Sequence, residues 1–287
     1  MRTLGWLILV AVAGVFGLVR ATGAQTAGLS GVIVYWSSEP WPSIWTVQPD
    51  GSHLHRILDN RQNAKRPRLS PDRAWVAFDG TPPGEPVMSD FDIQLVRLDG
   101  TGLHTLTRSP SWDTDAQWSP DGMSLSFTRS PPRPMDCFGS SIWIVRRDGS
   151  GAHLVVPGCG ARWSPDGARL VYSTESGHAL RIRNLKTGRA RRLASTQAFE
   201  VAAGWSPDGR KILFTREYDQ ARADVFVMNA NGANLHRLGS GFAACWSPDG
   251  SKILYTRFFS SSLFVMNRDG SHKHQIVAAS ASEPDWR

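Results

Sequence analysis

The sequence contains eight histidines, the side chains that most often bind metal ions in proteins. Five of them stand four residues after a glycine that follows Asp or Asn: His55, His104, His153, His236 and His274; Arg192 takes this position in one further copy. Ligands of one metal ion must converge within coordination distance, whereas one histidine in each of several repeats is spread around the molecule. The register therefore indicates a repeated surface position, and we expect no metal ion and no other cofactor.

One segment of the chain partly matches a motif that carries a serine nucleophile. Gly204-Trp205-Ser206 is similar to the start of a nucleophile elbow, which has glycine two residues before and two residues after the serine. Asp208 occupies the second glycine position here, and the segment lies between two strand-like runs rather than between a strand and a helix. Because no catalytic motif is complete, we expect that the chain is not an enzyme.

One five-residue stretch recurs along the chain and organises it. Trp-Ser-Pro-Asp-Gly begins at Trp118, Trp163, Trp205 and Trp246, a degraded copy begins at Leu69, and the chain ends on Trp286-Arg287. The steps between these markers are 49, 45, 42, 41 and 40 residues. Ser-Pro-Asp-Gly is typical of a tight turn, because proline presets φ and glycine accepts a left-handed conformation. A period of about 40–45 residues is typical of a β-propeller.

A second turn signal completes each repeat. Asp-Gly or Asn-Gly pairs, or Thr187-Gly188 in one copy, lie between apolar runs downstream of each first turn. Each repeat therefore predicts a four-stranded antiparallel meander, and six repeats predict an all-β, six-bladed propeller over residues 31–287. The first blade lacks an inner strand, while the chain ends on a first strand with nothing after it. We expect the C-terminal strand to join the N-terminal blade and close the ring.

The repeat resembles that of TolB-type propellers. The resemblance rests on the Trp-Ser-Pro-Asp-Gly turns, on the apolar strand that follows each of them, and on Val227-Met228-Asn229 and Val265-Met266-Asn267 in the third strands. It covers residues 31–287, so it concerns the propeller part of such proteins only. The resemblance implies the fold, whereas propellers carry many different activities.

The N-terminus is predicted to be a secretory signal. Met1-Arg2 precedes an apolar run from Leu4 to Val19, and small residues suit cleavage near residues 24–28, which assigns residues 1–24 to a signal peptide. The run is short for a membrane span of about 20 residues. We therefore expect a periplasmic or secreted monomer with no membrane span after cleavage. The alternative is a protein anchored by an uncleaved N-terminal helix.

The irregular loops are expected to lie on one face of the disc, opposite the uniform turns, and function on a regular scaffold gathers in such loops. Their aromatic and arginine residues have the composition of a protein-binding surface. The residues predicted to bind a partner are Trp41, Trp112, Arg129, Phe138, Phe199, Arg216, Tyr218, Arg257 and Phe258. Arg129, Arg216 and Arg257 share one repeat position and should reach one rim. We expect an envelope or extracellular protein or peptide as partner, and no nucleic acid.

Charged residues on or near the inner strands support a different function. The residues predicted to line the axial channel are Arg66, Arg68, Asp115, Arg162, Glu283 and Asp285. A carboxylate among arginines could process a glycan or a lactone, so a small hydrolase or lyase is the alternative to a binding scaffold. A solvated channel with no activity would have the same composition.

Cys137 and Cys159 are a possible disulfide, because both are expected on the loop face of the third blade and the predicted compartment allows disulfides. Cys245, beside Trp246, is expected to be buried and free.

The formal net charge is +7, but Lys and Arg are scattered through the repeats and form no long basic run. We interpret this charge as a soluble surface.

Overall fold

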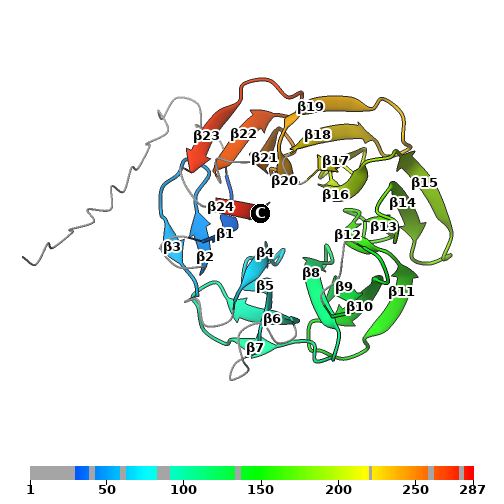
Figure 1. The fold of residues 1–287 in the computed structure, drawn as a ribbon. Helices are drawn as coiled ribbons and strands as arrows, with labels where there is room; N and C mark the ends of the chain where they lie inside the picture. The colour runs from blue at the N-terminus through cyan, green and yellow to red at the C-terminus, as the bar shows by residue number, and fades with distance from the viewer. Residues whose placement is uncertain are drawn as a thin grey trace, which may run out of the picture.

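The computed structural model describes residues 30–38, 43–58, 63–82, 91–132, 137–219, 222–257, 262–277 and 281–287, and every statement below concerns these ranges. Six four-stranded antiparallel sheets surround a central axis, and Figure 1 shows them as the blades of a disc. In five blades the strand order follows the chain order, so each blade is a meander. The predicted all-β, six-bladed propeller is confirmed.

The first three blades contain the N-terminal strands together with the last strand of the chain. Blade one consists of β24 (Ala281–Trp286), β1 (Ile33–Ser37), β2 (Ser43–Val47) and β3 (His55–Arg56). Blade two consists of β4 (Lys65–Leu69), β5 (Trp75–Gly80), β6 (Asp92–Arg97) and β7 (His104–Thr105). Blade three consists of β8 (Trp112–Trp118), β9 (Ser124–Ser130), β10 (Ser141–Arg146) and β11 (His153–Pro157).

The remaining blades follow in chain order around the disc. Blade four consists of β12 (Cys159–Trp163), β13 (Arg169–Ser173), β14 (Ala179–Asn184) and β15 (Ala190–Ser195). Blade five consists of β16 (Phe199–Trp205), β17 (Lys211–Asp219), β18 (Arg222–Asn229) and β19 (His236–Ser240). Blade six consists of β20 (Phe242–Trp246), β21 (Lys252–Thr256), β22 (Leu263–Asn267) and β23 (His274–Val277).

The C-terminal strand closes the ring as predicted. Strand β24 pairs antiparallel with β1, and Ile33 lies opposite Trp286. Val32 N donates to Arg287 O at 2.7 Å, and Arg287 N donates to Val32 O at 3.0 Å. Gly31 has φ +116°, and a Cβ there would lie 2.4 Å from Arg287 O, so the close approach of the two chain ends requires glycine. Closure removes the exposed edge that the first blade would otherwise have.

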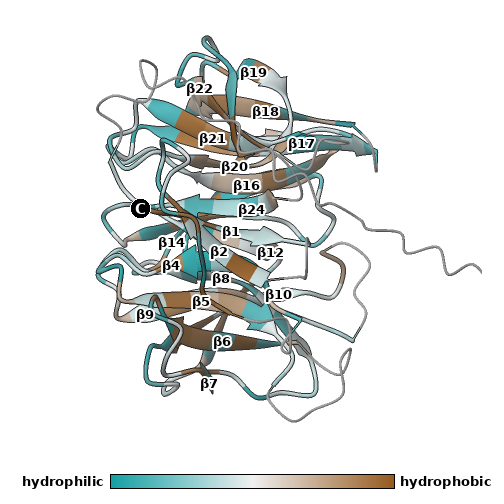
Figure 2. Ribbon diagram, turned by 90° about the vertical axis from the view of Figure 1, so that its left-hand side faces the viewer, coloured by the Kyte–Doolittle hydropathy of each residue, from teal (hydrophilic) through white to brown (hydrophobic). Residues whose placement is uncertain are grey.

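The repeated five-residue stretch forms the turn between the first two strands of a blade. In blade three, Asp121 Oδ1 accepts hydrogen bonds from Ser119 Oγ at 2.6 Å and Met123 N at 3.0 Å, and Gly122 N donates to Ser119 O. The Asp-Gly turn between the third and fourth strands lies on the same face, which we call the turn face. The remaining connections lie on the opposite face, which we call the loop face. Figure 2 shows the disc edge-on, between these two faces.

The tryptophan before each turn ties neighbouring blades together. Nε1 of Trp118 donates to Arg68 O at 3.0 Å, and Nε1 of Trp163 donates to Gln117 O at 3.1 Å. Around each such residue, the apolar faces of two adjacent sheets form a buried cluster, as Trp118 does with blades two and three. The core is therefore a set of clusters between blades. Trp118, Trp163 and Trp205 each add an anchoring hydrogen bond to their apolar area, whereas Trp246 contributes packing alone.

The five repeated histidines lie where their register predicted. Each is the first residue of the outermost strand of its blade, in β3, β7, β11, β19 and β23. They are spread around the rim and do not converge. Among the described residues, no group of three or more His, Cys, Asp or Glu side chains could hold a metal ion. Over the same ranges, no helix has the length and apolar character of a membrane span.

Candidate binding site at the loop end of the channel

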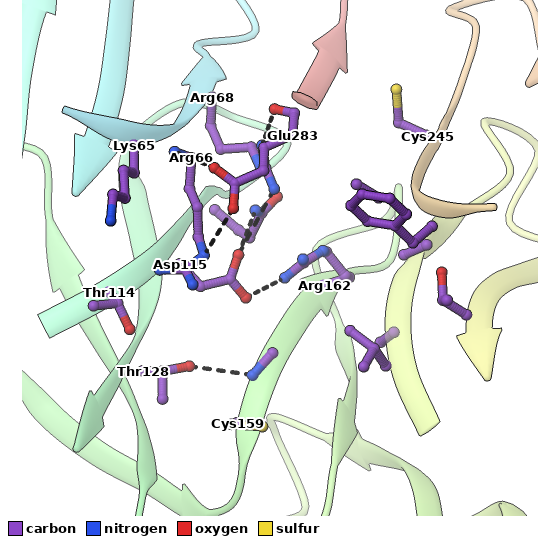
Figure 3. Close-up of a pocket in the computed structure, with 18 of the residues that line it drawn as sticks. Lys65, Arg66, Arg68, Thr114, Asp115, Thr128, Cys159, Arg162, Cys245 and Glu283 are labelled. Carbon is purple, nitrogen blue, oxygen red and sulfur yellow. Dashed lines mark hydrogen bonds and ion pairs between the residues drawn. The ribbon is translucent and has the colours of Figure 1, made fainter. Parts of the chain in front are cut away.

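The inner strands β4, β8, β12, β16, β20 and β24 surround a cavity of about 550 Å³ that opens on the loop face. Figure 3 shows the side chains that line it. The residues predicted for the channel, Arg66, Arg68, Asp115, Arg162, Glu283 and Asp285, all line this cavity. They come from blades one to four and form a charged side of the cavity, and Glu217 of β17 adds a carboxylate from blade five.

Asp115 is the centre of an ionic network on this charged side. Arg162 Nη1 lies 2.7 Å from Asp115 Oδ2, and Arg68 Nη2 lies 3.8 Å from Asp115 Oδ1. Arg66 Nη1 binds Asp79 Oδ2 at 2.8 Å, and Arg66 Nε lies 3.5 Å from Glu283 Oε1. The network crosses four blades and fixes the charged side chains relative to one another.

Two carboxyl groups of the network have pKa values shifted in opposite directions. Burial raises the pKa of Asp115, but the guanidinium groups of Arg162 and Arg68 outweigh burial and hold the pKa below its ordinary value of 3.8. Burial raises the pKa of Asp79 to about 6, because Arg66 only partly offsets the loss of solvation. Asp115 faces the cavity as a carboxylate, while Asp79 is fully buried behind it.

The charged residues stand on strained backbone. Arg66, Asp115 and Glu283 have φ of 48°, 53° and 53°, and each lies three residues before the marker position of its blade. In this left-handed region, a residue other than glycine costs roughly 1 kcal/mol. A β-bulge on the inner strand lies at each position. Charged side chains at strained positions beside a cavity point to a functional site.

Side chains and neighbouring strands satisfy the backbone at these bulges. Asp115 N donates to Asp79 Oδ1 at 2.8 Å, and Arg66 N donates to Glu283 Oε2 at 3.0 Å. Gly160 holds the same repeat position in blade four with φ 65°, and its N donates to Thr128 Oγ1 at 3.1 Å. The left-handed bulge is therefore not tied to a charged side chain, and only some blades carry a charged residue at this position.

The lining that β16 and β20 contribute is apolar, while β17 adds Thr215 and Glu217. The lining from β16 consists of Phe199, Val201, Ala202 and Ala203, and the lining from β20 consists of Phe242, Ala243, Ala244 and Cys245. Cys245 is a free cysteine, as predicted, but it is half-buried and not buried because it lines the cavity, and desolvation raises the pKa of its thiol. Figure 3 shows Cys245 across the cavity from Asp115 and Arg162. A ligand that entered would meet the charges of blades one to four on one side, and the hydrocarbon of β16 and β20 beside Glu217 on the other.

A rigid turn presents an exposed aromatic side chain at the loop end. Cys137 and Cys159 form a disulfide with Cα atoms 5.5 Å apart, and both residues line the cavity. Ser140 N donates to Cys137 O at 3.0 Å, and Gly139 has φ 70°, which is the conformation that a type II turn requires at its third residue. Phe138, the second residue of this turn, is 80% exposed. The disulfide thus holds a phenylalanine in solvent.

Three further aromatic residues predicted to bind a partner lie among the described residues. Trp112 lines the cavity and packs edge-on against Phe91, with ring centroids 5.1 Å apart. Phe199 lines it from the apolar side. Tyr218 is 40% exposed near the end of β17, and the Arg222 guanidinium lies 4.9 Å from its ring centroid. The structure therefore brings Trp112, Phe138 and Phe199 to the loop end of the channel.

The structure places two of the predicted rim arginines inside blades instead. Arg129 forms a two-bond pair with Asp113, with both N–O distances at 2.7 Å, and its guanidinium stacks on Trp143. Arg216 pairs with buried Glu200 at 3.0 Å and stacks on Phe226. Both pairs join an inner strand to the second strand of the same blade. These arginines therefore stabilise blades, and the expectation of a shared arginine rim is not supported at these positions.

Of the three remaining residues predicted to bind a partner, one lies among the described residues. The Arg257 guanidinium lies 5.0 Å from the ring centroid of Phe264. Trp41 and Phe258 lie outside the described residues.

The channel has a second, different opening on the turn face. A cavity of about 410 Å³ there is lined by the turn prolines Pro71, Pro120, Pro165, Pro207 and Pro248 and by marker tryptophans. It shares Gln117, Arg162, Ala203, Cys245 and Asp285 with the lining of the loop end. The inner strands thus have one end lined by repeated prolines and tryptophans and another end whose lining changes from blade to blade.

Sequence reasoning missed Asp79 and the internal partners of the arginines. A signal for the partners was present, since Asp113 and Arg129 are 16 residues apart, as are Glu200 and Arg216. In both blades this spacing places the two residues directly opposite each other on paired strands. Arg257 has glycine at the equivalent position, Gly241. Asp79 had no such signal, because only the bulge at Asp115 brings the two residues together.

Comparison with protein families supports the fold and the repeat. Residues 144–286 match the family model described as the TolB beta propeller domain. The match covers the last three blades and parts of blades one and three. Comparison with curated protein sequences found no match.

Solved structures with the same fold have diverse roles. A crystal structure of TolB from Acinetobacter baumannii is 21% identical, with 90% of this chain and 67% of that chain covered and a TM-score of 0.76. One chain of a nidogen/laminin complex is 13% identical, with coverage of 89% and 97% and a TM-score of 0.69. An oligogalacturonate lyase in complex with manganese is 11% identical, with coverage of 86% and 74% and a TM-score of 0.58. At these identities the similarity shows the fold alone.

Proposed function

Since the chain carries a β-propeller of the TolB-like family, we propose that it is a scaffold that binds a protein or peptide at the loop end of its channel. The partner would be an envelope or extracellular protein, and the protein would act outside the cytoplasm. The observation that carries the proposal is Phe138, an 80% exposed aromatic residue on a turn closed by a disulfide at the cavity. An aromatic side chain held rigidly in solvent loses little entropy on binding, which is a property of binding hot spots.

The two sides of the cavity support a partner segment of mixed character. Such a segment would place an apolar side chain against β16 and β20 and a polar or charged group against Asp115 and its arginines. Trp112 and Phe199, at the mouth, would flank the segment. Arg129 and Arg216 would contribute through the rigidity of their blades, because their charges are already paired.

Capture from an extracellular or envelope fraction tests the proposal. Immobilised wild-type protein should retain a partner, and Phe138→Ala should lose at least about tenfold of the retained amount. Met123→Ala is the matched control, since Met123 is 61% exposed on the turn face. Equal retention by the two variants and the wild type would contradict the proposal. Both variants should unfold at the wild-type temperature, because both side chains are exposed.

A second candidate function rests on the pair of carboxyl groups. Asp79, with a pKa of about 6, and Asp115, with a pKa below its ordinary value, lie on adjacent blades near arginines that could hold an anionic sugar or an opened lactone. Opposite shifts of neighbouring carboxyl groups are a property of acid–base pairs. Hydrolysis or elimination of a panel of glycans and lactones, abolished in Asp115→Ala, would favour an enzyme. Inactivity of the wild type on the panel would leave the binding scaffold as the better account.

A further inference from the structure

The outer half of blade four differs in charge from the outer halves of the other blades. From β14 to β15, residues 179–195, it contains six cationic side chains and no carboxylate: Arg181, Arg183, Lys186, Arg189, Arg191 and Arg192. The same part of blade three, residues 141–157, has two arginines and Asp148, and that of blade six, residues 263–277, has Arg268, Lys273 and Asp269. In the linear sequence these cations looked like part of a scattered distribution, but the strand pair gathers them at one edge of the disc (Figure 1).

The turn of blade four keeps its hydrogen bonds without an acidic residue. In blades one, two, three and six an aspartate caps this turn, as Asp99 Oδ1 does by accepting from Thr101 N at 2.9 Å. In blade four Asn184 Oδ1 accepts from Thr187 N at 2.8 Å, so a neutral amide replaces the carboxylate. The turn is therefore capped without the negative charge that the aspartates of blades one, two, three and six place near their cations; blade five, where Asn231 caps the turn, also lacks that charge.

Strand register places like charges directly opposite each other. Arg181 pairs with Arg192 across β14 and β15, and like charges in such a pair destabilise a sheet. Arg181 Nε is buried and has no hydrogen-bond partner among the described residues. Arg183 lies on the same strand two residues on, about 7 Å away, and its guanidinium reaches the turn at Gly188. This local conflict would be relieved by a bound anion.

None of the six cations forms an ion pair with another described residue. Lys186, Arg189, Arg191 and Arg192 are exposed. Arg191 donates to Ala230 O at 2.6 Å and so secures the edge to blade five. Between Gly149 and Phe199 the acidic residues are Asp166, which pairs with Arg169, and Glu175. The edge is thus a strip of positive charge without local neutralisation.

We propose that this cationic edge, the outer edge of blade four, binds a linear acidic polysaccharide. Arginine, which makes up five of the six cations, pairs with carboxylates through two parallel hydrogen bonds. The cations form a row at the turn end of the strand pair, from the Arg181–Arg192 pair to Lys186 and Arg189 in the turn, and repeated anions along a chain would match this row. This site is separate from the channel and does not depend on the proposed partner there.

The composition of the edge favours a polysaccharide over other polyanions. From residue 173 to residue 198 there is no Phe, Tyr or Trp, so the edge lacks the aromatic platforms on which single-stranded nucleic acids stack. The apolar residues Leu180 and Ile182 are buried, at 0% and 5% exposure, so they do not supply the apolar face that inserts into a lipid surface. What remains is spaced positive charge alone.

A binding titration with fluorescent alginate oligomers tests the inference, with neutral dextran as the uncharged probe. The triple variant Lys186→Gln, Arg189→Gln, Arg192→Gln should bind alginate at least about tenfold more weakly at low salt, and with a shallower salt dependence. The control triple Arg56→Gln, Arg210→Gln, Arg268→Gln makes the same change in net charge with exposed residues of other blades. It should retain most of the wild-type affinity.

Several outcomes would overturn the inference. Equal weakening in both triples would mean that net charge alone attracts the polymer. Absence of alginate binding by the wild type at low salt would remove the site. Tighter binding to duplex DNA or to phosphatidylglycerol vesicles, with the same loss in the first triple, would replace the polysaccharide with that partner. Matching thermal unfolding of the two triples keeps the comparison free of folding effects.

Discussion

The central channel ends differently on the two faces of the disc, although the same inner strands build both ends. At the turn end, proline and tryptophan recur at one position in most blades, and tryptophan Nε1 groups bond the neighbouring strand. At the loop end, one repeat position holds Arg66, Asp115, Gly160, Ala202, Ala243 or Glu283, according to the blade. The turn end therefore repeats what every blade needs in order to pack. At the loop end the residue type varies between blades because packing does not require one residue there. We therefore propose that the loop end carries the function.

Blade four also departs from the repeat, both at its inner strand and at its outer strands. Its inner strand supplies Arg162 to the network around Asp115, and its outer strands depart from the charge balance of the other blades. Departure from the repeat, rather than residue type, identifies both candidate sites.

Removing the closing strand should have the largest effect. A chain that ends at residue 280 lacks β24, and with it the pairing to β1 and the buried indole of Trp286. The inner edge of blade one would be exposed, so we expect loss of the cooperative unfolding transition in circular dichroism. An unchanged unfolding temperature after this truncation would show that the ring does not depend on closure.

Substitution at the turn end should reduce stability and leave binding intact. Trp118→Ala removes a side chain that is 2% exposed, together with its bond to Arg68 O, and should lower the free energy of unfolding in urea by about 3–5 kcal/mol. Trp118→Phe keeps most of the packing and should lose about 1 kcal/mol. If the folded alanine variant lost its partner while keeping its stability, the assignment of the two ends would be reversed.

Substitution at the loop end should lower the free energy of unfolding by an amount that depends on pH. Asp115→Asn leaves Arg162 without its carboxylate and should lower the free energy of unfolding by about 3 kcal/mol at pH 7. Because the folded-state pKa of Asp115 is lowered, its stabilisation is present above pH 3.8 and is lost as the pH falls below that value. The difference between wild type and variant should therefore shrink in acid, as measured by urea unfolding at a series of pH values. A difference that stayed constant at every pH would rule out a charge effect.

A turn aspartate should show the smallest effect, with the same sign. Side-chain and backbone hydrogen bonds from Ser119 and Met123 lower the pKa of Asp121, so its stabilisation too is lost as the pH falls below 3.8. Since the group is largely exposed, Asp121→Asn should cost less than about 1 kcal/mol at pH 7. A loss as large as that of Asp115→Asn would contradict the distinction between a solvated turn and a buried network.

The fold could be predicted because its determinants are local. Ser-Pro-Asp-Gly and Asp-Gly turns define strand ends by their own chemistry, and their spacing sets the number of blades. The register of the five histidines placed them on outer strands for the same reason. Ring closure could be predicted because the N-terminal blade lacked an inner strand and the chain ended on an inner strand that belonged to no other blade.

Much of the site depended on contacts between strands, which the sequence displays only as a spacing or not at all. Arg129 and Arg216 read as rim residues from their repeat position, yet Asp113 and Glu200 oppose them on the paired strands. The left-handed backbone at Arg66 and Asp115 arises from bulges that no local signal marks. The cations of blade four are spread over 12 positions, from Arg181 to Arg192, and antiparallel pairing folds them into one strip.

Photo-crosslinking from each face of the disc can show whether a partner binds at the loop end or at the turn end. A benzophenone amino acid placed at position 138, on the loop face, or at position 123, on the turn face, would report what contacts each exposed site in the native extracellular or envelope fraction. We expect one discrete crosslinked partner from position 138, lost when Asp115→Asn is combined with it, and none above background from position 123. A partner captured equally from both positions, or from position 123 alone, would contradict the assignment of function to the loop end.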